Sequence, residues 1–232
     1  MRFPAPLVRG SLVERYKRFL STVELEDGAR VTAHCPNPGS MIGLLNPGGE
    51  VWLSPSQNPN RKLPYTWELV RIDEGFVGIN TSLANRIVEE KLQAKTITEF
   101  ADYASLRREV RYGKNSRIDF LLDTPGKPSC YVEVKSVTLQ LGSSAAFPDA
   151  VTARGAKHLG ELAEVVRSGH RAILLYLVQR EDCGDFVLAE KIDPAYAEAM
   201  RTAREAGVET VCFTCRVGTA AIEMDRPLPF SF

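Results

Sequence analysis

The stretch RIDFLLDTPGKPSCYVEVKSV, residues 117–137, decides the fold of this chain because it predicts two strands joined by a tight turn. Arg117–Leu122 and Cys130–Val137 are rich in apolar and β-branched residues, which favour strands. The residues between them, DTPGKP, combine aspartate, proline and glycine in a way that is typical of a turn. We therefore expect an antiparallel hairpin whose turn is centred near Gly126.

The predicted hairpin carries three charged side chains that its geometry would bring together. Glu133 and Lys135 alternate along one strand, so they emerge on the same face. A turn centred near Gly126 sets Asp119 directly opposite Glu133, and cross-strand partners share a face. A register slip of one residue would instead turn Asp119 away and leave an ordinary hairpin with an exposed Glu-Lys pair.

The apolar neighbours of these charges favour the first of the two registers. Val132 and Val134 on one strand and Phe120–Leu122 on the other predict strands at the centre of a sheet. An unpaired carboxylate on a central strand is costly to bury, so it needs a partner. Two carboxylates and an ammonium that converge there would suit a Mg²⁺ ion and a water activated against a phosphodiester.

The composition limits the kinds of protein that this chain can be. Its 232 residues suffice for one large domain or two small ones, and 29 basic residues balance 29 acidic ones. Because the formal net charge is zero, any surface for a polyanion must be local. No apolar run is long enough to cross a bilayer, and the first residues lack a signal-peptide core. We therefore expect a cytoplasmic protein without membrane contact.

The five cysteines have no framework spacing, which agrees with a reducing compartment. Cys212 and Cys215 form a lone C-x-x-C within a strand-like run, where residues three apart face opposite ways. A structural zinc site would need two further ligands at similar spacing, and the neighbouring sequence offers none. We therefore interpret this pair as part of a strand.

Residues 1–81 contain short strand-like runs separated by glycine and proline, with no long helix between them. The dipeptide Asp27-Gly28 between two such runs is a hairpin signal. Five or six short strands in this length predict a small β-barrel, either the five-stranded oligonucleotide-binding (OB) barrel or an SH3-like barrel. We assign residues 1–81 to this small barrel and residues 82–232 to a second domain.

The second half of the chain alternates between helices and strands. We expect a helix from near Ser82, a strand over 106–112 before the hairpin, and a buried parallel strand over 172–178. The remaining expected elements are helices over 152–167 and 194–206 and a strand over 210–217. The order α-β-β-β-α-β-α-β predicts a mixed α/β (α+β) sandwich with helices on both faces of its sheet.

This order of elements resembles the restriction-endonuclease-like core of the PD-(D/E)xK nucleases, in which a hairpin carries the Asp and the Glu-x-Lys. Longer segments resemble the sugar fermentation stimulation protein A family. These segments are AHCPNPGSM (33–41), RKLPYT (61–66), REVRYG (108–113), SRIDF (116–120), YVEVKSVTL (131–139) and FPDAVT (147–152). The resemblance covers nearly the whole chain, and it implies an N-terminal OB-like domain, a C-terminal nuclease-like domain, DNA binding and nuclease activity.

The family resemblance also implies roles for the hairpin charges. Asp119 and Glu133 are the expected metal ligands, and Mg²⁺ or Mn²⁺ is the expected cofactor. Lys135, an ammonium between two carboxylates, should stay protonated. We therefore expect it to stabilise the negative charge that develops on the phosphate rather than to act as a general base.

Glu109 is the candidate third carboxylate of this metal site. A turn centred on Lys114 sets Glu109 opposite Asp119, whereas a centre half a residue later sets Val110 there instead. On spacing alone Glu109 could equally be an exposed residue among arginines. The family resemblance favours the catalytic and metal-binding interpretation.

Charged residues on the helix predicted over 152–167 form a second candidate feature. Arg154, His158 and Glu161 share one side of it, and Lys157 borders that side. This face would contact phosphates of the nucleic acid through its basic residues, or else it is an ordinary solvated face. We do not expect His158 to bind the metal, because Mg²⁺ prefers oxygen.

Basic and aromatic residues also alternate in the predicted barrel. Single-strand binders use such mixtures, since bases stack on rings while cations hold phosphates. The candidate nucleic-acid-binding residues there are Arg15, Lys17, Arg18, Arg61, Lys62 and Tyr65, with Trp67 in the same group. The alternative is that most of the aromatic rings fill the barrel core.

These features predict a nucleic-acid-binding protein that hydrolyses phosphodiester bonds in DNA or RNA with Mg²⁺ or Mn²⁺. The alternative is a DNA-binding regulator of sugar metabolism genes that keeps the nuclease fold without cutting. Two carboxylates beside a polyanion disfavour that alternative, because without a metal they would repel phosphates. A hydrolase of small phosphate esters is a third option, which the basic-aromatic barrel disfavours. The sequence leaves the oligomeric state open, a homodimer included.

Overall fold

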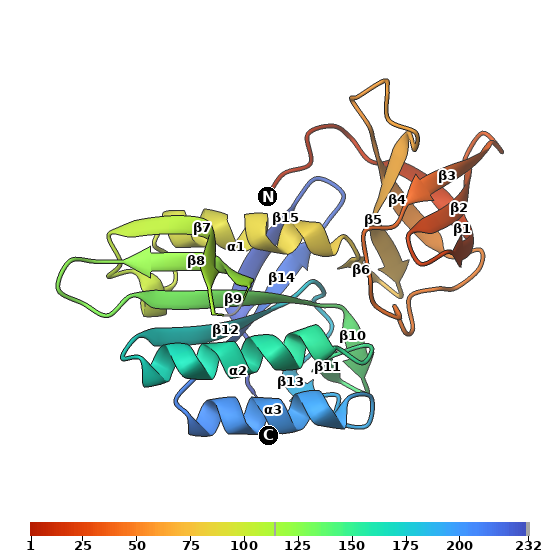
Figure 1. Cartoon of the computed structure of the whole chain (residues 1–232). Coiled ribbons are helices and arrows are strands. Elements are labelled where there is room, and N and C mark those ends of the chain that lie inside the picture. Colours follow the sequence, from red (N-terminus) through yellow and green to blue (C-terminus); the bar gives the residue numbers. More distant parts are fainter. Residues whose placement is uncertain (114, 231–232) are drawn as a thin grey trace.

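The computed structural model describes residues 1–113 and 115–230 of the chain. A closed β-barrel occupies the first third of the chain, and a larger sheet-rich domain follows it (Figure 1). The barrel lies to one side of the large sheet, beside the end at which α1 begins. The mixed α+β architecture predicted from the sequence is confirmed.

The barrel is built from short antiparallel strands. These are β1 (Val8–Tyr16), β2 (Leu20–Leu25), β3 (Arg30–His34), β4 (Glu50–Pro55), β5 (Tyr65–Ile72) and β6 (Gly75–Gly78). Their order is β3-β2-β1-β4-β5-β6, and a parallel pairing of β3 with β5 closes the first five strands. Leu12, Leu53 and Trp67 are buried at the centre, where alternate residues of each strand point inward.

The large sheet contains the predicted hairpin near its middle. Its strands are β7 (Ser105–Tyr112), β8 (Ser116–Asp123), β9 (Cys130–Val137), β12 (Arg171–Val178), β14 (Glu209–Val217) and β15 (Ile222–Pro227), in the order β15-β14-β12-β9-β8-β7. The strands β7, β8 and β9 are antiparallel neighbours, whereas β12 runs parallel to both β9 and β14. The hairpin strand β9 is therefore central, as its valines predicted.

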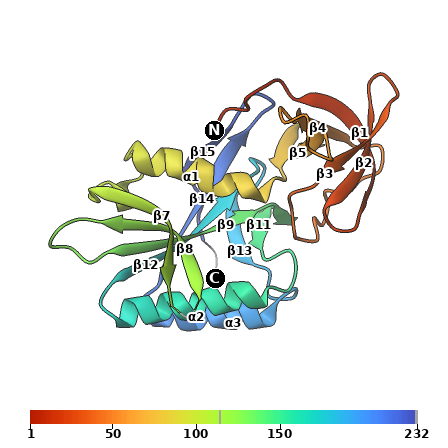
Figure 2. The same cartoon turned by 45° about the horizontal axis from the view of Figure 1, so that its top comes forward.

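Helices cover both faces of this sheet, as predicted (Figure 2). On one face α1 (Ala84–Gln93) buries Ile87 and Val88 against the sheet residues around Val132. On the other face α2 (Ala153–Arg167) and α3 (Pro194–Glu205) pack together and bury Leu159 and Met200. Short 3₁₀ turns, η1 (Thr81–Leu83) and η2 (Thr98–Phe100), flank α1.

A small additional sheet was not predicted from the sequence. It joins β10 (Leu139–Leu141), β11 (Ser144–Phe147) and β13 (Asp185–Leu188) in the order β10-β11-β13. Strands of three or four residues are too short to show a hydrophobic period, which is why these strands were not predicted. The strand β15, whose exposed end is polar, was missed for a related reason.

The first residues pack against the second domain, although the sequence interpretation placed them with the barrel. The amino group of Met1 donates to the carbonyl of Ile222 at 2.8 Å and lies 2.7 Å from the carboxylate of Glu90. The chain therefore contacts the second domain with its first residue before it enters the barrel. The domain boundary at residue 81 stays a prediction.

The C-x-x-C pair lies on β14, with its two thiols on opposite faces of the sheet. Cys212 belongs to the core under α2 and α3, and Cys215 to the core under α1. Among the helices of the described residues, none is long and apolar enough to cross a membrane.

Candidate active site

The β8–β9 hairpin has the register that the sequence predicted. The last pair of the ladder joins Phe120 to Val132, so the same register sets Asp119 opposite Glu133. Beyond that pair the two strands separate, and the Asp119 carboxylate occupies the gap. Its Oδ2 accepts a hydrogen bond from the backbone N–H of Val134 at 2.7 Å.

A second hydrogen bond fixes Asp119 from the opposite side. The Asn85 side-chain amide, on the first turn of α1, donates to Asp119 Oδ1 at 2.7 Å. Asn85 is not among the site residues predicted from the sequence. The available signal was an asparagine inside a predicted helix, where it is a poor helix former and so invites another explanation.

Glu133 is the most buried charge of the site, with 3% of its surface exposed. Its Oε1 accepts a hydrogen bond from Lys135 Nζ at 2.8 Å and contacts Nδ1 of His158. Its Oε2 is buried, and no described residue offers it a hydrogen bond. Such an oxygen is costly to leave alone, and a bound cation would satisfy it.

The pKa values of the two carboxyls shift in opposite directions. Burial and the charge of Glu133 raise the pKa of Asp119 to about 6, although hydrogen bonds from Val134 and Asn85 oppose them. Burial also tends to raise the pKa of Glu133, but the bond from His158 and the Lys135 ammonium outweigh it and lower that pKa. The site therefore holds one firmly ionised carboxylate beside one that is reluctant to ionise without a cation.

The described residues contain no group of three His, Cys, Asp or Glu side chains that is already arranged to hold a metal ion. Asp119 and Glu133 are a two-carboxylate set, and water would have to complete the coordination. This donor set suits Mg²⁺, which commonly binds through one or two carboxylates and keeps several waters.

Glu109 lies opposite Asp119, so β7 and β8 adopt the first of the two registers considered from the sequence. The pairs on either side of it, Arg108 with Phe120 and Val110 with Ile118, are both in place. Glu109 has φ = 52°, in the left-handed region, which is unusual for a strand residue other than glycine.

Glu109 is exposed on the edge strand β7. It lines a hollow of about 470 Å³ together with Asp119 and Glu133. This position agrees with a supporting role at the site, although its carboxylate forms no compact cluster with the other two.

The basic residues of α2 line the same hollow. Lys157 Nζ donates to Ser116 Oγ at 3.3 Å and lies 3.5 Å from Glu161 Oε1. Arg154 Nε donates to His158 Nε2 at 3.3 Å. His158 is 5% exposed, so its ring bridges Arg154 to Glu133 and is mostly shielded from an incoming ligand.

The first basic group of the barrel consists of Arg15, Lys17 and Arg18. These three residues have different surroundings. The Arg15 guanidinium donates to the carbonyls of Asn37 and Gly39 at 2.8 and 3.0 Å, so it holds a loop together. Arg18 Nε donates to Pro38 O at 2.8 Å, and its side chain lines a cavity between the domains. Lys17 is exposed.

The second basic group lies at the start of β5. Arg61 donates to Thr66 Oγ1 at 2.8 Å, Lys62 is exposed and Tyr65 is half-buried. Trp67 is fully buried and donates to the carbonyl of Leu69 at 2.8 Å, so it offers no ring for a base to stack on. The core interpretation is therefore correct for Trp67.

Comparisons with known proteins agree with this architecture. Residues 13–79 match the SfsA N-terminal OB domain, which excludes the SH3-like alternative, and residues 82–221 match the sugar fermentation stimulation protein RE domain. The sugar fermentation stimulation protein homologue of Paramagnetospirillum magneticum is 54% identical over 98% of this chain and 97% of its own length. The Rhodospirillum centenum homologue is 55% identical over the full length of both chains.

A solved structure of Pyrococcus furiosus SfsA in complex with Ca²⁺ superposes with a TM-score of 0.91 and 26% identity, covering 100% of this chain and 98% of that one. Sequence relatives and folded structure thus agree over both domains. The chain belongs to the sugar fermentation stimulation protein (SfsA) family.

Proposed function

We propose that this protein is a divalent-metal-dependent nuclease that hydrolyses phosphodiester bonds in DNA or RNA. The observation that carries the proposal is the buried Oε2 of Glu133, which lacks a hydrogen-bond donor among the described residues and lies across the hairpin from the Asp119 carboxylate. Most buried side-chain oxygens in folded proteins have a hydrogen-bond partner, so this oxygen needs an explanation, and a bound cation supplies one.

Asp119 and Glu133 would hold the ion, and Mg²⁺ or Mn²⁺ is the proposed cofactor. A relative of known structure, Pyrococcus furiosus SfsA, was solved with Ca²⁺, a cation with the same preference for oxygen ligands. The ion would supply an activated water and a positive charge for the phosphate. The backbone N–H of Val134 and the amide of Asn85 keep the Asp119 oxygens in a fixed orientation.

Lys135 has a role that does not require it to lose its proton. Its ammonium is held on Glu133 Oε1 at 2.8 Å, and its side chain is 14% exposed. A cation held in this way can stabilise the negative charge that develops on the phosphate as the bond to the leaving oxygen breaks.

Positive groups near the carboxylates support a polyanionic substrate. Arg154 and Lys157 line the same hollow as Asp119 and Glu133, and neither is on the strands that carry the carboxylates. They would position flanking phosphates, which fix the strand without reading its sequence. Lys17 and Lys62 of the barrel are exposed, so they are available as further phosphate contacts.

A cleavage assay tests the proposal. Labelled single- and double-stranded DNA and RNA are incubated with Mg²⁺, Mn²⁺, Ca²⁺ or EDTA, using the wild type, Asp119→Asn and Glu133→Gln. Asp123→Asn is the matched control, because Asp123 lies on the same strand but pairs with Arg107 and Ser129 outside the hollow.

We expect cleavage with Mg²⁺ or Mn²⁺ that both site variants abolish and the control retains. Tight binding without cleavage, unchanged in the site variants, would contradict the proposal and favour the regulator that does not cut.

A further inference from the structure

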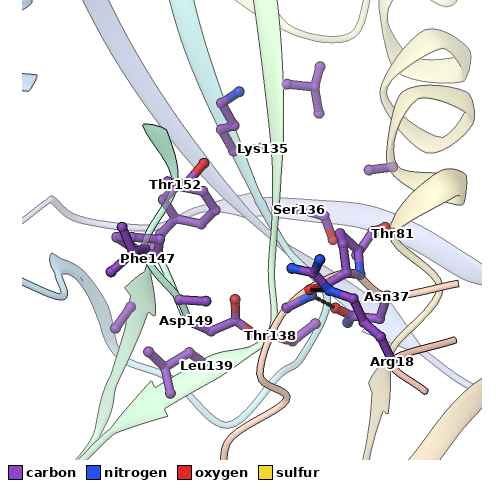
Figure 3. A pocket seen from close by; sticks show the side chains of 18 of the residues that line it. Arg18, Asn37, Thr81, Lys135, Ser136, Thr138, Leu139, Phe147, Asp149 and Thr152 are labelled. Atoms are coloured by element: carbon purple, nitrogen blue, oxygen red, sulfur yellow. Dashed lines mark hydrogen bonds between the residues drawn. The ribbon is translucent and has the colours of Figure 1, made fainter. Parts of the chain in front are cut away.

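A second cavity, of about 310 Å³, lies between the barrel and the large domain (Figure 3). Arg18 and Asn37 of the barrel side face Phe147 and Thr152 across it. Its lining continues along η1 and the first turn of α1, the end of β9, and the segment from β11 to α2. The cavity exists only because the two domains are packed together.

This cavity adjoins the proposed metal site through two residues. Lys135 lines the cavity, and its ammonium is bound to Glu133 Oε1, which belongs to the other hollow. Asn85 also lines the cavity and donates to Asp119 Oδ1. The side chains of Lys135 and Asn85 therefore lie between this cavity and the hollow that contains Asp119 and Glu133.

The lining offers polar groups that suit a phosphate and a sugar. Arg18 brings a guanidinium from the barrel, and Lys135 an ammonium from β9. The side-chain amide of Gln179 donates to Ser136 Oγ at 2.7 Å, so the hydroxyl hydrogen of Ser136 is directed elsewhere and can be donated to a ligand. The carboxylate of Asp149 also lies in the lining, but it accepts the backbone N–H of Met41 at 3.0 Å.

The same lining has an apolar side that suits a base. Leu139, Ala146, Phe147 and Pro148 lie on the wall formed by the small sheet and the segment after it. At the rim Val151 is 76% exposed, an unusual position for a valine in a segment that packs against a second domain. An apolar side chain at such a rim is placed to contact a base that has left its stack.

We infer that this interdomain cavity binds one unpaired nucleotide next to the scissile phosphate, so that the enzyme prefers single-stranded nucleic acid. The inference rests on the proposed nuclease function and adds its substrate class. A volume of about 310 Å³ is at the lower end of small-molecule sites, which suits one nucleotide. A base that remains stacked in a duplex cannot enter a cavity walled by two domains, whereas an unpaired one can.

Binding measurements in Ca²⁺ test the inference independently of cleavage. The probes are labelled single-stranded, blunt duplex and overhang-bearing oligonucleotides of one sequence, with free nucleoside monophosphate as a fourth probe. We expect single strands and overhangs to bind at least about ten-fold more tightly than blunt duplex.

Variants at the cavity locate the effect. Arg18→Ala and Val151→Glu should each weaken single-strand binding about three- to ten-fold and reduce the preference over duplex. Both residues are exposed, so the variants should fold. Val151→Gln has nearly the same size and shape as Val151→Glu but no charge, so comparing the two separates the effect of shape from that of charge. Leu141→Glu adds the same charge to an exposed apolar position that does not line the cavity. Arg30→Ala is the matched loss of an exposed barrel arginine.

The outcomes distinguish this inference from the proposed function. Equal binding of single strand and blunt duplex, or equal effects of Val151→Glu and Leu141→Glu, would overturn the single-nucleotide cavity even if metal-dependent cleavage is found. Free nucleotide binding as tightly as the oligonucleotide would overturn it in favour of a small phosphate ester. A single-strand preference that needs Arg18 and Val151 supports it, whether or not the assay detects cleavage.

Discussion

Asp119 Oδ2 accepts the backbone N–H of Val134 at 2.7 Å, at the point where the β8–β9 ladder stops. A carboxylate thus takes the hydrogen bond that a partner strand would otherwise make. The separation of the two strands leaves room for the carboxyl groups of Asp119 and Glu133. Burial keeps both groups from turning toward solvent, so the hairpin presents two oriented carboxyl groups.

Asn85 should control metal affinity without binding the metal. Asn85→Ala removes the amide that holds Asp119 Oδ1, and the loss of a partner of this kind typically costs about ten-fold or more in metal affinity. Calcium titration by calorimetry measures the effect. Gln93→Ala on the same helix should leave affinity unchanged, and equal affinities for all three proteins would contradict the assignment.

His158 should act on Glu133 through orientation. His158→Ala removes the ring that contacts Glu133 Oε1, so we expect metal affinity to fall about ten-fold or more. His158→Asn retains a side-chain nitrogen near the same position and should recover part of the loss. Full activity and metal affinity in His158→Ala would show that the contact is dispensable.

The raised pKa of Asp119 predicts a pH dependence of stability in EDTA. A carboxyl whose pKa is about 6 when folded and 3.8 when unfolded favours folding in its protonated form, so its contribution is present at low pH and is lost as pH rises through 6. Each unit of difference corresponds to about 1.4 kcal/mol, so the whole effect is a few kcal/mol at most.

The comparison of Asp119→Asn with the wild type isolates this effect. We expect the melting temperature of the variant relative to the wild type to rise between pH 5 and pH 8 in EDTA, on the order of a few degrees for a domain of this size. Saturating Mg²⁺ should abolish the trend by stabilising the wild type. A flat difference in EDTA would show that the carboxyl ionises without cost.

Gly39 and Asp149 should show coupled effects on stability. A Cβ at residue 39 would overlap the carboxylate of Asp149, which also accepts the N–H of Met41. We expect Gly39→Ala to destabilise the protein by about 1–3 kcal/mol in urea unfolding. In an Asp149→Ala background the same change should cost clearly less, and strict additivity would argue against the contact.

Arg154 and Lys157 should govern the salt dependence of nucleic-acid binding. If each contacts one phosphate, the double alanine variant lowers affinity and reduces the slope of log affinity against log salt by about 2. Arg167→Ala with Arg201→Ala, two exposed arginines on α2 and α3, is the charge-matched control. An unchanged slope would exclude phosphate contact at both positions.

Local pattern was sufficient to predict the hairpin and most of the elements around it. The turn centre at Gly126 fixed the register that sets Asp119 opposite Glu133, because strand periodicity leaves only two choices and burial favours one. The same reasoning failed for β10, β11 and β13, whose three or four residues carry no detectable period.

The sequence by itself determined the positions of the longer strands, the hairpin register and the pairing of Glu133 with Lys135, since each depends on residues close together in the chain. Only the tertiary structure decided that Asn85 holds Asp119, that His158 contacts Glu133, and that a cavity lies between the domains. Those contacts join segments 25 or more residues apart, and their geometry depends on how whole helices and domains pack.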